Sequence, residues 1–317
     1  MQRYDLVVIG SGPAGRRAAV QAAKLAKSVL VIENRLRVGG VSVHTGTIPS
    51  KTLRETVLNL SGWRERGFYG LAYRVKKDIE GRDLGARLNM TLDHECEVLE
   101  HQFARNGVQT MAGAARFLDP HHIEVTPPKG DLVKIAADKV VIAVGTRPYR
   151  PSNVPFDDHA VVDSDSLVGE PRVPRSLCVI GAGVIGLEYA TIFSALDVPV
   201  TIVEPRPNFL EFIDREIIDE FVHELRKRGV TFRLGCKLDR VELDERGWPV
   251  AILDDQRRVR SEMLLYAAGR VGATDNLGLE ACGLTVDARG RLAVDAVTFQ
   301  TAVPHIYAAG EIGRAHV

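Results

Sequence analysis

An α/β fold is predicted by one pattern that occurs twice in the 317 residues: an apolar run, a glycine-rich turn, a helix and a second apolar run that ends in glutamate. In the first copy, the turn Gly10–Gly15 has the spacing GxGxxG and the second run ends at Glu33. In the second copy, the turn Gly181–Gly186 has the same spacing and the run ends at Glu204, equally far along the chain. Short continuous apolar runs are typical of parallel strands buried on both faces. The sequence therefore predicts two Rossmann-like modules.

Each element of the first module follows from its residues. Leu6–Ile9 and Val29–Ile32 are the expected strands, and an alanine-rich helix lies between them. Gly10 permits a tight turn, Gly12 lets the backbone approach a pyrophosphate, and Gly15 allows the helix to lie close to the strand. The free N–H groups and the partial positive charge at the helix N-terminus suit phosphate.

The second module repeats these roles with Gly181, Gly183 and Gly186. In either module, the glutamate that ends the second strand can bond a ribose hydroxyl. A glycine turn alone is a weak signal and also occurs without a ligand, but turn, strands, helix and acid together favour a dinucleotide site. Two such sites imply two dinucleotides, as in a flavin enzyme that exchanges hydride with a nicotinamide coenzyme.

The composition is that of an ordinary globular protein and disfavours two classes of partner. Hydrophobic residues make up 45% and charged residues 26% of the chain, and the formal net charge is zero. A neutral chain is not expected to bind nucleic acid or an anionic membrane as its main partner. No apolar run is long enough to span a bilayer, and a strand that begins near residue 6 leaves no room for a signal peptide. We therefore expect a cytoplasmic protein.

No metal site is expected. The cysteines lack metal-type spacing and are expected to be reduced and mostly structural; they are Cys96, Cys178, Cys236 and Cys282. His121 and His122 follow a proline in a predicted turn. Exposed turn histidines explain them better than a metal does, because no second cluster of ligands lies nearby in the sequence.

The segment Gly39–Lys51 carries the most specific information about function. Its sequence, GGVSVHTGTIPSK, resembles the redox loop of the pyridine nucleotide-disulfide oxidoreductases, a family that includes dihydrolipoamide dehydrogenase and glutathione reductase. In that family the loop holds two cysteines against the flavin ring, whereas this chain has Ser42 and Thr47 at those positions. A hydroxyl group forms no thiolate and cannot hold electrons as a dithiol. The combination is most similar to the soluble transhydrogenase branch of the family, whose loop also lacks the pair.

The resemblance covers essentially the whole chain and implies its domain organisation. It implies an FAD-binding domain at residues 1–150 and 271–317, with an NAD(P)-binding domain at residues 151–270 inserted in it. It also implies a C-terminal dimerisation domain that is missing here. We therefore expect a C-terminally truncated chain with an incomplete FAD-binding domain, and residues 311–317 are expected to be partly artificial. Residues 64–112 are expected to be mostly helical, and residues 149–175 to form a crossing linker and a helix start.

Further cofactor-binding positions follow from the resemblance. Besides the glycines and glutamates of the two modules, they are Gly39, Gly40, Ala115, Gly145, Gly269 and Glu311. The family usually has an aspartate where this chain has Glu311, and that aspartate bonds the ribityl chain of the flavin.

Lys51 and Glu188 are the expected catalytic pair. The resemblance implies that the lysine approaches flavin N5 and pairs with the glutamate, and a cation there would stabilise the reduced flavin. The alternative is an unrelated surface lysine and a helix-face glutamate, because surface pairs are common.

Arg206 bears on the choice of coenzyme. A carboxylate at Glu204 favours the ribose 2′-OH of NAD and repels a 2′-phosphate, whereas Arg206 could receive the phosphate of NADP. Two alternatives stay open from the sequence: an NAD-selective module with a solvated Arg206, and a module that uses both coenzymes.

The resemblance implies a flavoprotein oxidoreductase that uses FAD, NAD and NADP. Hydride would pass from NADPH to FAD and from FAD to NAD+, with no protein residue as nucleophile. The rival interpretations are an NAD(P)H-dependent quinone or dye reductase that lacks redox cysteines, and a non-catalytic flavin-binding fragment. The intact protein is expected to be a homo-oligomer.

Overall fold

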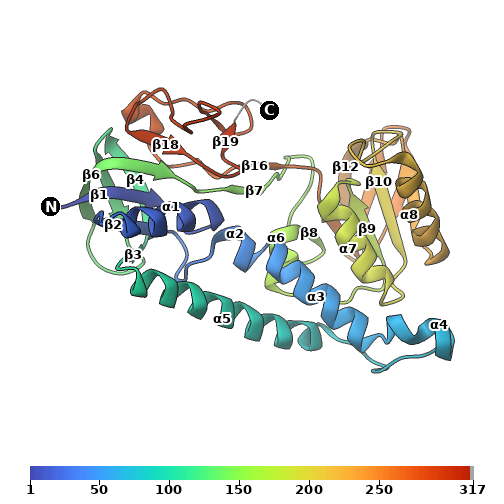
Figure 1. The fold of residues 1–317 in the computed structure, drawn as a ribbon. Helices are drawn as coiled ribbons and strands as arrows, with labels where there is room; N and C mark the ends of the chain where they lie inside the picture. Colours follow the sequence, from blue (N-terminus) through green and yellow to red (C-terminus); the bar gives the residue numbers. More distant parts are fainter. Residues whose placement is uncertain (315–317) are drawn as a thin grey trace. The chain divides into compact units, whose positions relative to one another are not determined.

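The computed structural model describes residues 1–314, which form two compact units (Figure 1). Unit 1 contains Met1–His44, Leu92–Arg147 and the chain from Arg270 onward. Unit 2 contains Thr45–Thr91 and Pro148–Gly269. The last three residues of the segment expected to be partly artificial, 315–317, lie outside the described residues.

This division differs from the predicted one for residues 45–91, which belong to unit 2 instead of the unit that contains the first glycine turn. The reason is tertiary packing. Helix α3 (Thr47–Leu60) lies against helix α7 (Val184–Ser194). The buried Arg66 donates from Nη1 to Asp197 Oδ1 at 2.9 Å. The expected domain bounds came from the resemblance to the family, and the assignment of residues 45–91 to the FAD-binding domain stays a prediction.

The core of unit 1 is a seven-stranded sheet in the order β3-β2-β1-β6-β5-β4, with β18 also paired to β6. β3, β2, β1, β6 and β18 are parallel, and the β4-β5-β6 meander is antiparallel. These strands are β1 (Gln2–Ile9), β2 (Val29–Glu33), β3 (Gln109–Ala112), β4 (Ala114–Asp119), β5 (His122–Thr126), β6 (Val133–Ile142) and β18 (Ile306–Ala308). Val7, Val31 and Val140 are fully buried at the sheet centre, as expected of parallel strands covered on both faces.

The helices of unit 1 include α1 (Pro13–Lys24), α2 (Gly40–His44) and the second half of α5 (Gly81–Arg105), with the 3-10 helix η2 (Leu279–Cys282). Helix α1 connects β1 to β2 as predicted, and it ends at Lys24, shortly before Ala26, which has a positive φ of 57°. The shorter strands are β7 (Thr146–Pro148), β16 (Arg270–Gly272), β17 (Leu292–Ala293) and β19 (Gly313–Arg314). β7 pairs with β16, which places the exit and return of the chain side by side in unit 1.

Unit 2 contains a five-stranded parallel sheet in the order β11-β10-β9-β15-β8 and a three-stranded antiparallel sheet β12-β13-β14. The parallel strands are β8 (Val161–Asp163), β9 (Leu177–Ile180), β10 (Val200–Glu204), β11 (Thr231–Leu234) and β15 (Met263–Tyr266). The antiparallel strands are β12 (Leu238–Leu243), β13 (Pro249–Leu253) and β14 (Arg258–Arg260). Helix α8 (Arg215–Lys227) follows β10 in the chain, and α7 connects β9 to β10.

The helix start predicted within residues 149–175 is confirmed, because α6 (Ser164–Gly169) lies there. The same segment also contains β8, an edge strand of the parallel sheet, which was not predicted. Asp163 caps α6, because its Oδ1 accepts the N–H groups of Asp165 and Ser166 at 2.8 and 2.9 Å. Strand β8 is only three residues long, so its sequence gives too little periodicity for a prediction.

Residues 64–112 are helical only in part: η1 (Trp63–Glu65) and α4 (Arg66–Tyr69) precede α5, and the segment ends in β3. Among residues 1–314, no helix has both the length and the apolar character that crossing a membrane requires.

Two candidate dinucleotide-binding sites

The first glycine turn requires glycine at two of its positions. Gly10 has a positive φ of 101°, and a Cβ there would lie 2.4 Å from the Ala143 carbonyl oxygen. A Cβ on Gly15 would lie 2.0 Å from the Gly10 carbonyl oxygen. The turn is therefore tight and α1 lies close to β1, as the spacing predicts.

Gly12 serves a different purpose, because it faces open space. A Cβ built on Gly12 meets only the Gly40 Cα, 4.0 Å away. Gly12 is also the N-cap of α1 and offers no side chain to bond the first-turn N–H groups. Free donors beside an open space fit a phosphate group, which is the chemistry expected of a dinucleotide pyrophosphate at this turn.

Glu33 ties the glycine turn to the loop that follows β2. Its Oε2 accepts the Ser11 N–H at 3.0 Å and also the Ser11 hydroxyl. The Ser11 Oγ in turn accepts the Gly39 N–H at 2.8 Å, and Glu33 Oε1 accepts the Arg35 N–H at 3.1 Å. Sequence reasoning missed Ser11, because the bridge needs a residue 28 positions away.

The Gly39–Gly40 segment therefore lies directly over the glycine turn. Gly40 has a positive φ of 60°, and a Cβ there would come within 2.7 Å of the Gly12 Cα. A side chain at Gly40 would push the loop away from the turn. Ala115, another expected contact, is buried on β4.

A second group of candidate residues gathers around Thr146. The Thr146 hydroxyl donates to Glu311 and accepts from Arg270 Nε at 2.9 Å, and Arg270 Nη2 donates to the Thr146 carbonyl at 2.8 Å. Beside them, Gly145 has a φ of 67° and open space where a Cβ would stand. Thr146 and Arg270 were not predicted as site residues. They are distant in sequence from each other and from Glu311, and no motif links them.

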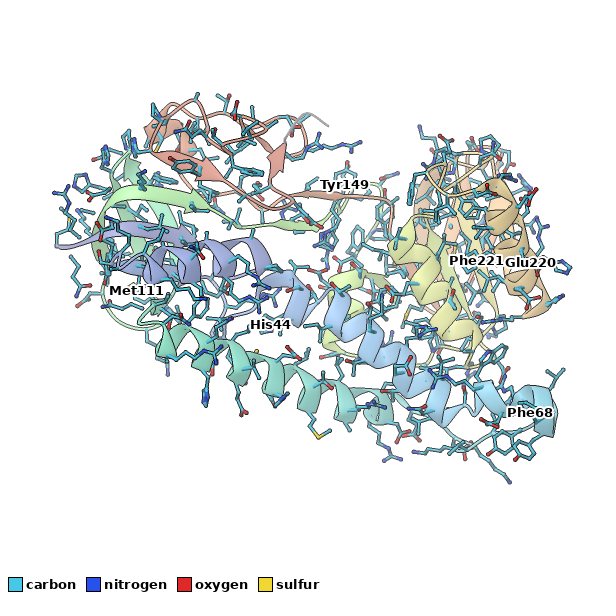
Figure 2. All side chains as sticks on the ribbon, viewed as in Figure 1. His44, Phe68, Met111, Tyr149, Glu220 and Phe221 are labelled. Carbon is cyan, nitrogen blue, oxygen red and sulfur yellow. The ribbon has the colours of Figure 1, made fainter. Side chains whose placement is uncertain are left out.

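Hydroxyl groups occupy both redox positions of the loop. Ser42 lies in α2 and donates from Oγ to the Gly39 carbonyl at 3.1 Å, and Thr47 is the first residue of α3. His44, labelled in Figure 2, ends α2, and its Nε2 lies 3.2 and 3.1 Å from the carbonyl oxygens of Arg37 and Val38.

The cysteines do not replace the missing pair. Cys96, Cys178, Cys236 and Cys282 are all free and buried. Burial raises the pKa of Cys178 to about 12, and burial, with the nearby Asp119 and Glu280, raises that of Cys282 to about 11. Thiols with such pKa values are protonated at neutral pH and react poorly with disulfides.

Of the two histidines predicted in a turn, His121 lies in the turn and His122 is the first residue of β5. His122 Nδ1 lies 2.8 Å from Asp119 Oδ2, and the His121 ring stacks on His305 with centroids 3.9 Å apart. Within residues 1–314 there is no group of three or more His, Cys, Asp or Glu side chains placed to hold a metal.

The second glycine turn repeats the geometry of the first. Gly181 has a φ of 104° with the Ala267 carbonyl oxygen 3.0 Å from a built Cβ, and a Cβ on Gly186 would lie 2.1 Å from the Gly181 carbonyl oxygen. Gly183 is the uncapped N-cap of α7 and has nothing within 4 Å of a built Cβ. Gly269, with a φ of 118°, also has open space. The same donors and the same space fit a second dinucleotide.

Glu204 and Arg206 form a compact charged pair at the end of β10. Glu204 Oε1 accepts from Arg206 Nε at 2.7 Å and from the Arg206 N–H at 3.1 Å, while Oε2 accepts the Ala182 N–H at 2.8 Å. The Glu204 side chain is 3% exposed and that of Arg206 is 55% exposed. The guanidinium thus partly neutralises the carboxylate and keeps its outer N–H groups toward solvent.

The pKa of Glu204 reflects this pairing. Burial by itself would raise that pKa, but the hydrogen bonds from Arg206 and Ala182 outweigh it and hold the pKa below the ordinary value of 4.5. Because the folded pKa is lowered, the pair stabilises the fold above the ordinary value, and this contribution is lost as pH falls through the lowered pKa. Glu204 is therefore ionised at neutral pH.

Lys51 and Glu188, the predicted catalytic pair, are in contact within unit 2. Lys51 on α3 donates from Nζ to Glu188 Oε1 on α7. The Lys51 side chain is 57% exposed and that of Glu188 is 18% exposed. The contact is thus an ion pair open to solvent, and its role toward a flavin stays a prediction.

A profile of the family described as "Pyridine nucleotide-disulphide oxidoreductase" matches residues 4–315. The chain belongs to this family. The family and its flavoprotein members imply FAD as the cofactor, and the open, donor-rich space at Gly12 is consistent with it.

Relatives within the family are similar over nearly the whole chain. A soluble pyridine nucleotide transhydrogenase of Mycobacterium bovis (strain BCG / Pasteur 1173P2) is 46% identical over 98% of this chain, and one of Chromohalobacter salexigens is 38% identical over 98%. The chain spans 66% of the length of the first relative and 67% of that of the second.

Solved structures of the family share the fold. LpdA from Mycobacterium tuberculosis has a TM-score of 0.88 and 27% identity, covering 99% of this chain and 68% of its own. A Cu(II) complex of the HOCl-induced flavoprotein disulfide reductase RclA from Escherichia coli has a TM-score of 0.85 and 28% identity, covering 98% of this chain and 66% of its own. The predicted α/β fold with two dinucleotide-binding domains is thereby confirmed.

Proposed function

We propose that this chain is the coenzyme-binding part of a flavoprotein that transfers hydride between NADPH and NAD+ through FAD. The observation that carries the proposal is the combination of two complete glycine turns with hydroxyl groups at both redox positions, Ser42 and Thr47. A protein with two such turns would bind two dinucleotides, and without a thiol pair in the loop it cannot transfer electrons to a disulfide. The similarity to proteins named soluble pyridine nucleotide transhydrogenase also supports this proposal.

The residues of unit 1 would bind and orient FAD. The N–H groups at the start of α1 would hold the pyrophosphate beside Gly12, and the Glu33–Ser11–Gly39 bridge would keep the loop over it. The Thr146–Glu311 pair offers a hydroxyl and a carboxylate for the ribityl hydroxyls. When bound there, FAD would supply the hydride transfer itself.

The second module would accept both nicotinamide coenzymes in turn. A bare carboxylate at Glu204 would repel a 2′-phosphate, but the Nε of Arg206 already covers one of its oxygens. The remaining N–H groups of Arg206 can bond a 2′-phosphate, and the Glu204 carboxylate can still accept a ribose hydroxyl. We therefore propose that the pair lets one site use NAD and NADP.

We expect the full-length protein to reduce thio-NAD+ with NADPH and to reduce neither oxidised glutathione nor lipoamide, because no thiol pair lies in the loop. Steady-state assays with each acceptor check this result. Disulfide turnover as fast as transhydrogenation would contradict the proposal. Faster reduction of quinones than of thio-NAD+ would favour a quinone reductase. Flavin retained through gel filtration without turnover of any acceptor would favour a non-catalytic flavin-binding fragment.

We expect Lys51→Met to lower the midpoint potential of the bound flavin, because a nearby cation favours added electrons. A shift of roughly 30 mV corresponds to about 1.4 kcal/mol for a two-electron couple. The melting temperature should change little, since the Lys51–Glu188 pair is exposed to solvent. Spectroelectrochemical titration measures the potential.

Lys227→Met is the matched control for this experiment. Lys227 donates to Glu224 at 2.6 Å in an exposed pair on α8 and has a side chain 56% exposed, nearly as exposed as that of Lys51. Its loss should leave the potential unchanged. If the two substitutions have equal effects on the potential, Lys51 is an ordinary surface residue.

A further inference from the structure

Unit 1 contains a cavity of about 410 Å³ that neither glycine turn lines. It lies between α1, which contributes Arg16 and Arg17, and the second half of α5, which contributes Glu95, Val98, Leu99 and Arg105 among others. On α5 the residues Glu95, Val98, Gln102 and Arg105 follow one another at intervals of three or four, so they share one face of the helix. The volume is within the usual range for small-molecule sites.

The cavity has an excess of positive charge that the fold does not neutralise. Arg16, Arg17 and Arg105 have no hydrogen-bond or ion-pair partner for their guanidinium groups among residues 1–314, and Glu95 is the one carboxylate on the cavity wall. Arg37, also in unit 1, shows the contrast, because it bonds both Asp93 and Glu100 at 3.0 Å.

Arg16 is the most informative of the three. Its side chain is partly buried, and burial, together with the neighbouring Arg17, lowers its pKa, while Glu95 acts in the opposite direction. An arginine in a protein does not deprotonate, so its charge persists in this partly desolvated place. Partial removal of this charge from water costs free energy, which Glu95 offsets only in part, and a bound anion would offset more of it.

We propose that this cavity binds an organic phosphate. Guanidinium groups bond phosphate oxygens in pairs, and guanidinium groups from two helices can hold a polyphosphate from both sides. Val98, which is 49% exposed, and the buried Leu99 give the cavity an apolar wall for the organic part. The site shares no residue with the glycine turns and is independent of the hydride transfer proposed above.

The test is ATP binding by the flavin-loaded protein, measured by calorimetry with the nicotinamide site saturated by NAD+. We expect the double variant Arg16→Gln/Arg105→Gln to bind ATP at least tenfold more weakly than the unmodified protein, with flavin content unchanged. The control Arg233→Gln/Arg246→Gln removes two other arginines that lack side-chain partners in the described chain, and it should bind ATP normally. Equal ATP binding by both double variants would overturn the proposal.

Further ligands define what the cavity recognises. Adenosine should bind much more weakly than ATP, because it lacks the phosphates; equal affinity would exclude a phosphate site. Tripolyphosphate should bind more weakly than ATP, because it cannot use the wall formed by Val98 and Leu99; equal affinity would show that the organic part is not recognised.

A chemical modification experiment tests the same site in the unsubstituted protein, so its result does not depend on whether the variants fold. Phenylglyoxal modifies accessible arginines, and mass spectrometry locates the products. ATP should protect Arg16 and Arg105 severalfold and leave Arg233 unprotected. Failure of ATP to protect Arg16 selectively would count against the site.

Discussion

Gly12→Val should abolish flavin retention while the protein stays folded. A valine Cβ at this position meets only the Gly40 Cα at 4.0 Å, and Gly12 has φ −62° and ψ 179°, a conformation open to valine. The side chain would instead fill the space that the pyrophosphate needs. We expect roughly 100-fold weaker FAD binding, about 2.8 kcal/mol. Flavin absorbance after gel filtration and the circular dichroism spectrum measure the two outcomes.

Gly183→Val is the matched control. Gly183 stands at the equivalent place in the second module, with φ −75° and ψ 174° and nothing within 4 Å of a built Cβ. This variant should keep its flavin and lose nicotinamide coenzyme binding, the reverse of Gly12→Val. A Gly12→Val protein that remains yellow would show that the pyrophosphate does not lie at this turn.

Arg206→Ala should weaken NADPH binding and spare NADH. The substitution removes the donors proposed for the 2′-phosphate and exposes the carboxylate of Glu204, which would then repel that phosphate. A hydrogen bond to a charged group contributes about 1.5–3 kcal/mol, so the dissociation constant for NADPH should rise roughly 10–100-fold. The constant for NADH should change by less than about threefold, equivalent to under 0.7 kcal/mol. Fluorescence titration of each coenzyme measures both.

Arg35→Ala provides the comparison inside the same chain. Arg35 lies two residues after Glu33, as Arg206 lies two residues after Glu204, but Glu33 bonds only the backbone N–H of Arg35. Its removal should leave both nicotinamide constants unchanged. If Arg206→Ala weakens NADH and NADPH equally, the arginine supports the fold of the module and does not select the coenzyme.

The glycine turns could be predicted because their requirements are local. A positive φ at Gly10 and the close approach of α1 at Gly15 are properties of a short segment, and the GxGxxG spacing records them directly. The absence of the redox pair could be predicted as well, because it depends only on the residue types at positions 42 and 47 of the loop, where Ser42 and Thr47 stand.

The supporting groups of the candidate sites could not be predicted. The Ser11 bridge to Gly39 spans 28 residues, and the Thr146 hydroxyl joins Arg270 and Glu311 across 124 and 165 residues. No characteristic spacing of residues in the sequence predicts such contacts, because they form only when separate strands and loops have been brought together. The arginine-lined cavity is of the same kind, since α1 and α5 lie far apart in the chain.

The sequence by itself determined that this protein has two dinucleotide modules of one family and no thiol pair in its loop, because glycine conformation and side-chain chemistry are properties of single residues and short segments. The tertiary structure decided how those residues are supported. It placed residues 45–91 with unit 2, where α3 lies against α7 and Lys51 reaches Glu188, and it set Arg206 on the carboxylate of Glu204. Packing and long-range hydrogen bonds make these choices, and they depend on the folded chain as a whole.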